Sequence, residues 1–291
     1  MIRATRTGFL ELSLNRVASQ KLDLSKVQNQ AVTGLAFQRA SEAPVAMAVA
    51  QGLNSVALDQ DVYVANAASA VGPLTTADEA LARVSDLMVR ARELSVAMAG
   101  DTATADMRTI AAVEVRALGE ELLGLANTRY GDRYLFSGTT WNTEPFAADG
   151  TYSGSTDEPE ARVAESRYVR TAFDGSQVFN GAADVFASID DLATALETND
   201  ATGIGTALTD VDSASRAIVN VRGEIGLETL AAEDAGELAE SLSVVYNERL
   251  SVLVTADPVE TYTRMNELQS AYEATLQVIA SASSKSLLDY L

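Results

Sequence analysis

Residues 7–36 read TGFLELSLNRVASQKLDLSKVQNQAVTGLA, and their spacing decides the fold class. Apolar residues recur there at alternating steps of four and three, the heptad spacing of a helix that packs along another helix. The row consists of Leu10, Leu14, Val17, Lys21, Leu24, Gln28, Ala31 and Leu35. Because Lys21 and Gln28 dilute it, this row predicts a coiled-coil seam with little apolar surface.

The same spacing continues downstream and predicts further long helices. We expect a second helix over residues 45–70, a bend or break at Gly72-Pro73, and a third helix from Thr76. Gly100-Asp101-Thr102 predicts a short turn, after which a fourth helix returns antiparallel to the third.

Helices are predicted again in the second half of the chain. One covers residues 184–198 and another 204–222, after which Gly223 and Gly226 either interrupt the pattern or lie inside one long helix. The last helix carries a heptad row formed by Met265, Leu268, Tyr272, Thr275, Ile279 and Ala282.

The middle of the chain has a different composition. Residues 137–182 are rich in Gly, Thr, Ser and Asp, and Asp174-Gly175 between two β-like runs predicts a hairpin. We therefore predict a mainly α fold, in which the N- and C-terminal segments form a long antiparallel helical bundle or coiled coil and a small β-rich domain is inserted. The expected segments are an N-terminal assembly helix (1–44), two bundle halves (45–133 and 183–254), a β-rich outer insertion (134–182) and a C-terminal assembly helix (255–291).

Composition excludes several functions. The net charge of −20 argues against nucleic acid and anionic membranes as partners, and no apolar run is long enough to span a membrane. The chain has no cysteine and no histidine, which excludes thiol and histidine-based catalysis and the commonest metal ligands. Adjacent acids such as Glu120-Glu121 point in different directions on a helix, so we predict no catalytic, metal or cofactor site and no enzyme.

The two terminal rows are too weak to hold a helix on their own. Burying one leucine contributes only about 1.5–3 kcal/mol, and the alanine, lysine and glutamine in these rows add little. Either the terminal helices pack on their own domain, or they become ordered when neighbouring copies supply the missing surface. We favour the second interpretation, because Leu287, Leu288, Tyr290 and Leu291 form an apolar tail on an acidic chain.

Four stretches resemble the flagellin superfamily. Gln28–Pro44 is similar to its N-terminal pattern, although Ser41-Glu42-Ala43-Pro44 has one acid fewer than the family's turn, and Leu87–Val96 is similar to its Arg-Glu-Leu helix. The segment ANTRYGDRYLFSGT at 126–139 resembles the hook–filament junction proteins among the hook-associated proteins, as does the ending SLLDYL. The motif residues that carry this resemblance are Asn127, Tyr134, Leu135, Phe136 and Gly138.

The resemblance implies a structural subunit of the bacterial flagellum that connects hook to filament. Such a subunit is extracellular and is exported by the flagellar type III route without a cleaved signal peptide, consistent with an N-terminus that lacks an apolar signal region. Its expected partners are other copies of itself, a neighbouring hook-associated protein, flagellin and an export chaperone. The expected assembly interface comprises Leu10, Leu14, Val17, Leu24, Leu35, Met265, Leu268, Tyr272, Ile279, Leu287, Leu288 and Leu291.

Two alternatives remain at this point. The chain is a filament flagellin, in the same superfamily but elsewhere on the organelle, or it is a cytoplasmic helical adaptor. The adaptor alternative requires well-ordered termini in the isolated chain.

Overall fold

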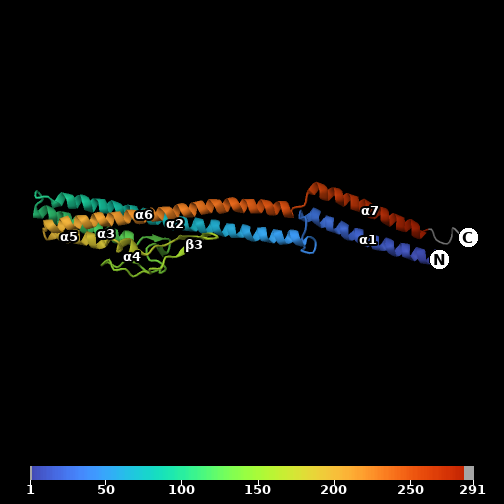
Figure 1. Cartoon of the computed structure of the whole chain (residues 1–291), viewed down its shortest axis with the longest axis horizontal. Coiled ribbons are helices and arrows are strands. Elements are labelled where there is room, and N and C mark those ends of the chain that lie inside the picture. Colours follow the sequence, from blue (N-terminus) through green and yellow to red (C-terminus); the bar gives the residue numbers. More distant parts are fainter. Residues whose placement is uncertain (1, 285–291) are drawn as a thin grey trace. The chain divides into compact units, whose positions relative to one another are not determined.

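The computed structural model describes residues 2–284, with side chains described over residues 11–281, and most of it is helical (Figure 1). The helices are α1 (Ile2–Thr33), α2 (Pro44–Ala99), α3 (Ala105–Ala126), α4 (Gly175–Phe179), α5 (Val185–Glu197), α6 (Ala201–Val254) and α7 (Pro258–Ser284). The strands are β1 (Arg129–Tyr130), β2 (Arg133–Tyr134), β3 (Glu160–Ala164) and β4 (Arg167–Arg170), paired antiparallel as β1–β2 and β3–β4. The predicted mainly α fold with a small β-rich insertion is confirmed. Within the described residues, no helix has the length and apolar content needed to cross a membrane.

The chain divides into two compact units, which we describe separately. Unit 1 comprises residues 1–58 and 243–291, and unit 2 comprises residues 59–242. Unit 1 therefore contains α1, α7 and the adjoining ends of α2 and α6. The finer division into assembly helices, bundle halves and outer insertion stays a prediction.

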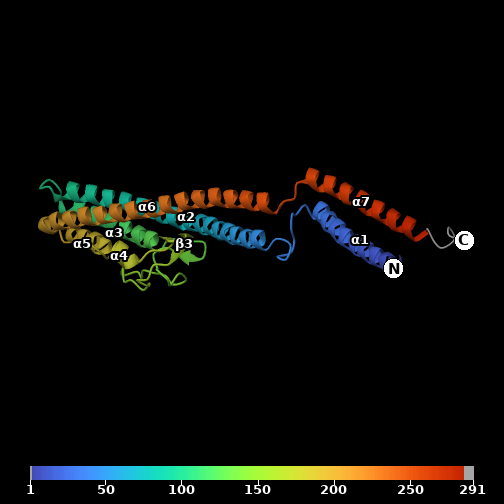
Figure 2. The ribbon, with the colours of Figure 1, turned by 45° about the vertical axis from the view of Figure 1, so that its right-hand side comes forward.

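Unit 2 has a dense hydrophobic core. In both views α3 and α5 lie along α2 and α6 (Figures 1 and 2), and α3 packs closely on α5. Side chains from all four helices and the insertion are fully buried there, the largest being Phe136, Phe146, Phe179, Leu74, Leu81, Met88, Leu122, Leu192, Leu196, Ile204, Ile218 and Ile225. Burial of this kind stabilises unit 2 by itself.

Polar caps set the ends of these helices. The Thr104 hydroxyl accepts the Met107 N–H at the start of α3, and the Asp184 carboxylate accepts the Ala187 N–H at the start of α5. Arg108, 7% exposed, donates to the Met98 and Gly100 carbonyls near the end of α2. A cation at this position compensates the partial negative charge at the end of a helix.

The predicted break at Gly72-Pro73 is wrong, because α2 runs without interruption through both residues. The neighbouring Leu74 is fully buried in the core, and this packing outweighs the hydrogen bond that Pro73 cannot donate. Gly72 allows a close approach instead of ending the helix, since a Cβ at this position would overlap the Tyr130 ring. The prediction of a separate helix from Thr76 is corrected for the same reason.

For α6, the alternative of one long helix is the one observed. Helix α6 continues through Gly223 and Gly226, and the neighbouring Ile218 and Ile225 are fully buried. Core packing again outweighs the low helix propensity of glycine.

The hairpin predicted at Asp174-Gly175 is also wrong. Asp174 caps the short helix α4, its carboxylate accepting the Ser176 N–H at 2.9 Å. The actual hairpin is β3–β4, which contains an irregularity between Arg162 and Ala164. A short acidic residue followed by glycine suits both a turn and a helix start, so this dipeptide alone cannot distinguish them.

Unit 1 is built differently, from pairs of helices. α1 and α7 lie side by side and run antiparallel (Figures 1 and 2). At the start of α7, the Asp257 carboxylate accepts the N–H groups of Val259 and Glu260.

Candidate assembly surfaces

The heptad row of α7 is the side of this helix that packs toward α1. Met265, Leu268, Tyr272 and Ile279 are all half-buried, whereas most of their neighbours on α7 are exposed. Thr261, which begins the same row, is fully packed against the rest of unit 1. The predicted spacing therefore matches the observed contact side, and part of each side chain is still accessible. Its use as an interface between copies stays a prediction.

On α1, the row of residues that contacts α7 differs from the predicted row at every second position, where it is shifted by one residue. The side chains turned away from water include Val17, Gln20, Leu24, Val27 and Ala31. Gln20 and Val27 thus stand where Lys21 and Gln28 were expected. This arrangement leaves the Lys21 ammonium in water and buries a valine, and both effects lower the free energy. The buried Gln20 Oε1 has no hydrogen-bond partner among the described residues.

Two predicted interface residues lie largely outside the contact with α7. Leu14 is 57% exposed and Leu35 is 38% exposed. They are available to another molecule, whereas Val17 and Leu24 are partly used within the chain. The Leu10 side chain, together with Leu287, Leu288 and Leu291, lies outside the described residues.

Unit 1 has very little core. Among its described side chains, the buried hydrophobic ones are Val27, Phe37, Ala50 and Ala57. Leu12, Leu22 and Val32 of α1 are more than two-thirds exposed. A half-buried leucine contributes only about 1 kcal/mol, which scarcely offsets the entropy of ordering one residue. Unit 1 is therefore far less stable by its own packing than unit 2.

The two linkers of unit 1 pair with each other. Leu35, after α1, forms an antiparallel bridge with Thr255, before α7. Two backbone hydrogen bonds of 2.8 Å hold it, from the Ala36 N–H to the Val254 carbonyl and from the Ala256 N–H to the Gly34 carbonyl. We call this bridge with its two hydrogen bonds the linker clasp. It ties together two positions that are far apart in the sequence.

The acidic turn before α2 is also hydrogen-bonded. The Glu42 carboxylate accepts the Gln38 N–H at 2.9 Å and the Arg39 N–H at 3.4 Å. These backbone donors, the Gln38 N–H above all, lower the pKa of Glu42 below its ordinary value. The single acid that this turn retains is thus the one that organises it.

The motif residues 127–138 build the insertion in unit 2. Asn127 accepts the Phe146 N–H at 3.0 Å and donates to the Phe146 carbonyl at 2.9 Å, so its amide pairs with a loop nineteen residues away. Leu135 and Phe136 are buried, and the Phe136 ring meets Phe179 edge-to-face at 5.2 Å. Tyr134 is half-buried and its N–H donates to the Trp141 carbonyl. These roles are structural.

Gly138 occupies a position that only glycine fits. Its φ is +59°, and a Cβ would overlap the carbonyl oxygens of Ser155 and Asp157. Nearby, the Tyr152 hydroxyl donates to the Ser155 carbonyl at 2.8 Å, and burial raises the pKa of Tyr152 to about 12.

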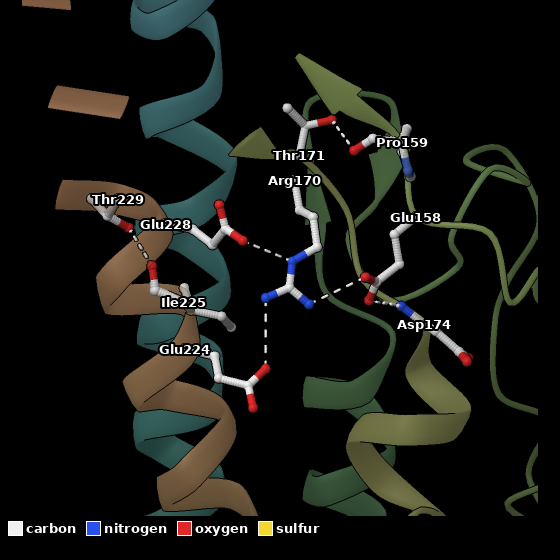
Figure 3. Close-up of polar contacts among 9 residues, drawn as sticks. All are labelled: Glu158, Pro159, Arg170, Thr171, Asp174, Glu224, Ile225, Glu228 and Thr229. Carbon is white, nitrogen blue, oxygen red and sulfur yellow. Dashed lines mark hydrogen bonds and ion pairs between the residues drawn. The ribbon is translucent and has the colours of Figure 1, made fainter. Parts of the chain in front are cut away.

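An ion-pair cluster fixes the β3–β4 hairpin to α6 (Figure 3). Arg170 lies between Glu228 at 2.9 Å, Glu158 at 3.2 Å and Glu224 at 3.6 Å. Burial disfavours the charge on Arg170, but the carboxylates of Glu228 and Glu158 outweigh it and raise the pKa of Arg170. On the other side of the hairpin, the Asn66 amide of α2 donates to the Arg162 carbonyl. The insertion is thus attached to both long helices.

Within residues 11–281, no cluster of three or more acidic side chains is arranged to hold a metal ion. The surfaces described above, with their half-buried apolar rows, are suited to binding other helices.

Comparison with known proteins identifies the class. Residues 11–140 match the family described as the bacterial flagellin N-terminal helical region. The N-terminal part of the chain thus matches the flagellin superfamily, which its motifs predicted.

Within this class, the chain is similar to flagellar hook-associated protein 3 of Escherichia coli (strain K12). The two are 25% identical over 292 aligned residues, which cover 90% of this chain and 92% of the relative. The fold is shared with Xanthomonas campestris FlgL (TM-score 0.60, 21% identity, 67% of this chain and 98% of that one). It is also shared with a putative flagellar hook-associated protein from Vibrio parahaemolyticus (TM-score 0.65, 17% identity, 73% of this chain and 99% of that one).

Proposed function

We propose that the chain is a structural subunit of the bacterial flagellum that joins hook to filament. The observation that carries this proposal is the similarity to flagellar hook-associated protein 3 along nearly the whole of both chains. The flagellin alternative has narrower support, because the similarity to flagellin B of Helicobacter pylori covers 46% of this chain and 26% of that protein. The role is mechanical, with contacts between subunits in place of a catalytic site.

The terminal helices carry the assembly in this proposal. The half-buried row of α7 and the exposed leucines of α1 supply apolar surface that the isolated subunit leaves in contact with water. Neighbouring copies cover it, so that α1 and α7 gain their order from the polymer. The neighbouring hook-associated protein and flagellin bind at the two ends of this assembly, and an export chaperone protects the apolar C-terminal segment before export. Export proceeds without cleavage, and the assembled subunit is extracellular.

The test is complementation of a strain that lacks this subunit. The wild-type chain, labelled on the exposed loop around Trp141, is expected to restore motility and to be found in one narrow zone between hook and filament. Labelling along the whole filament would identify a flagellin, and labelling confined to the cytoplasm would identify the adaptor.

Two variants test the terminal helices. Leu14→Asp combined with Leu10→Asp, or deletion of residues 286–291, is expected to abolish motile filaments because assembly surface is lost. The control is Asn15→Asp, which adds a charge on the same exposed helix without removing a leucine. Normal filaments from both test variants would overturn the assigned role of the termini.

A further inference from the structure

One stretch of unit 1 outside the terminal helices carries no charge at all. Residues 44–58 of α2 contain no Asp, Glu, Lys or Arg, in a chain whose net charge is −20. The adjoining end of α6, residues 243–254, has one Glu and one Arg and is therefore neutral. These two helix ends lie side by side (Figures 1 and 2).

Each of these helix ends has two apolar rows. The first row is turned away from water and includes Ala50 and Ala57 of α2 and Leu250 and Leu253 of α6. The second row is exposed. It consists of Val45, Val49 and Val56 on α2 and of Val245 and Val252 on α6. The α6 valines are one heptad apart, the spacing that matches a helix lying alongside.

Both exposed rows lie on the same side of the helix pair. At 3.6 residues per turn, the exposed valines of α2 are rotated by roughly a quarter of a turn about the helix axis from the buried row of α2. The exposed valines of α6 are rotated by roughly a third of a turn from the buried row of α6. Both rotations have the same sense when each helix is viewed from its N-terminus. Because α2 and α6 run antiparallel, rotation in the same sense places both rows on one side. We call these five residues the valine face.

Within the part of the chain that the structure describes, nothing covers the valine face. Val49 is 50% exposed and Val252 is 79% exposed, and a Cβ at Gly52, beside the α2 row, would meet no atom within 4 Å. A contiguous exposed apolar face on two neighbouring helices is characteristic of a binding surface.

We propose that the valine face binds helices of a second copy of this chain, which extends the assembly surface beyond the terminal helices. This inference rests on the proposed function. The occupant is a second copy because two subunits of charge −20 repel each other, so that they approach most favourably where neither carries net charge. The valine face is such a place. A positively charged partner would instead bind at an acidic patch of the surface.

The test compares two double variants in the complemented strain. Val49→Glu with Val252→Glu places two charges on the valine face. The matched control, Leu58→Glu with Val244→Glu, adds the same charges to residues that are 55% and 62% exposed on the opposite side of the same helix pair. We expect the first variant to reduce the number of subunits retained per flagellum at least tenfold, and the control to retain wild-type numbers.

The outcomes separate the two proposals. If wild-type subunits occupy the junction and the Val49/Val252 variant does so equally well, the valine face is not an interface, while the proposed function stands. If wild-type subunits are absent from the flagellum, the proposed function itself fails. Equal loss in both variants would also count against the valine face, because the effect would then follow charge and not position.

Cysteine variants give a second measurement that does not depend on charge. Since the chain has no native cysteine, Val49→Cys and Leu58→Cys each introduce a single thiol. In isolated flagella, a short bis-maleimide is expected to cross-link Val49→Cys subunits to each other and to leave Leu58→Cys subunits uncross-linked. Equal cross-linking at both positions would overturn the proposal.

Discussion

At the scale of single residues, the family motif acts by shaping the backbone. The Asn127 amide fixes the loop at Phe146, and Gly138 admits the carbonyls of Ser155 and Asp157 where other residues carry a side chain. Resemblance picked out both residues from the sequence. Their roles were not predictable, because the groups that they contact lie about twenty positions away in a segment with no regular pattern.

Gly138→Ala is expected to destabilise the insertion. Positive φ with a Cβ, together with overlap of two carbonyls, costs about 2–3 kcal/mol. Chemical denaturation followed by circular dichroism measures the free energy of unfolding of unit 2. Gly124→Ala is the control, because this exposed glycine of α3 has open space around it and the change is expected to stabilise by about 0.5–1 kcal/mol. Equal stability of the two variants would refute the role assigned to Gly138.

At the scale of elements, heptad spacing predicted the long helices, and it identified the contact row of α7 correctly. It failed where a local signal competed with burial. Pro73 interrupts a sequence pattern but not α2, because the residues beside it are in the core of unit 2. On α1, the pattern was displaced by one residue at alternate steps. Val27 is more apolar than Gln28 and is the residue that is buried, whereas Gln20 and Lys21 are both polar. The sequence cannot rank Gln20 against Lys21 without knowing what faces them.

The linker clasp was not predictable either, because it pairs residues more than two hundred positions apart. Its two hydrogen bonds flank the pair Leu35–Thr255, which makes this a non-hydrogen-bonded antiparallel pair with Cα atoms about 4.5 Å apart. That separation lies within the range of a disulfide.

Leu35→Cys with Thr255→Cys is therefore expected to form an intramolecular disulfide readily in native buffer. The product migrates faster on a non-reducing gel, because the bond closes a long loop in the denatured chain. Each single variant serves as a control and forms only dimers between chains. If the double variant oxidises no faster in native buffer than in concentrated urea, the clasp does not exist in solution.

At the scale of the whole molecule, stability is unequally distributed. Unit 2 buries large side chains completely, whereas the buried hydrophobic residues in the described part of unit 1 are one valine, one phenylalanine and two alanines. The weak terminal rows were predicted from sequence, and the partial exposure of the α7 row agrees with that prediction. How the chain divides between the two units required the structure.

Hydrogen exchange of the isolated subunit is expected to follow this division. Amides of residues 11–33 and 258–281 should exchange at least a hundredfold faster than those of residues 74–94 in the core of unit 2, because little packing opposes local opening. Mass spectrometry of proteolytic fragments measures the difference. In assembled flagella, the terminal amides should become protected. Equal protection of both regions in the isolated subunit would contradict the proposal that α1 and α7 gain their order from neighbours.

The clasp has one more consequence, for the way in which chains of this kind diversify. The polypeptide leaves α1 and enters α7 at two backbone sites that are paired with each other. Recombination at these two sites would therefore exchange α1 and α7 together between related chains. The paired backbone of the two linkers would be preserved in the product.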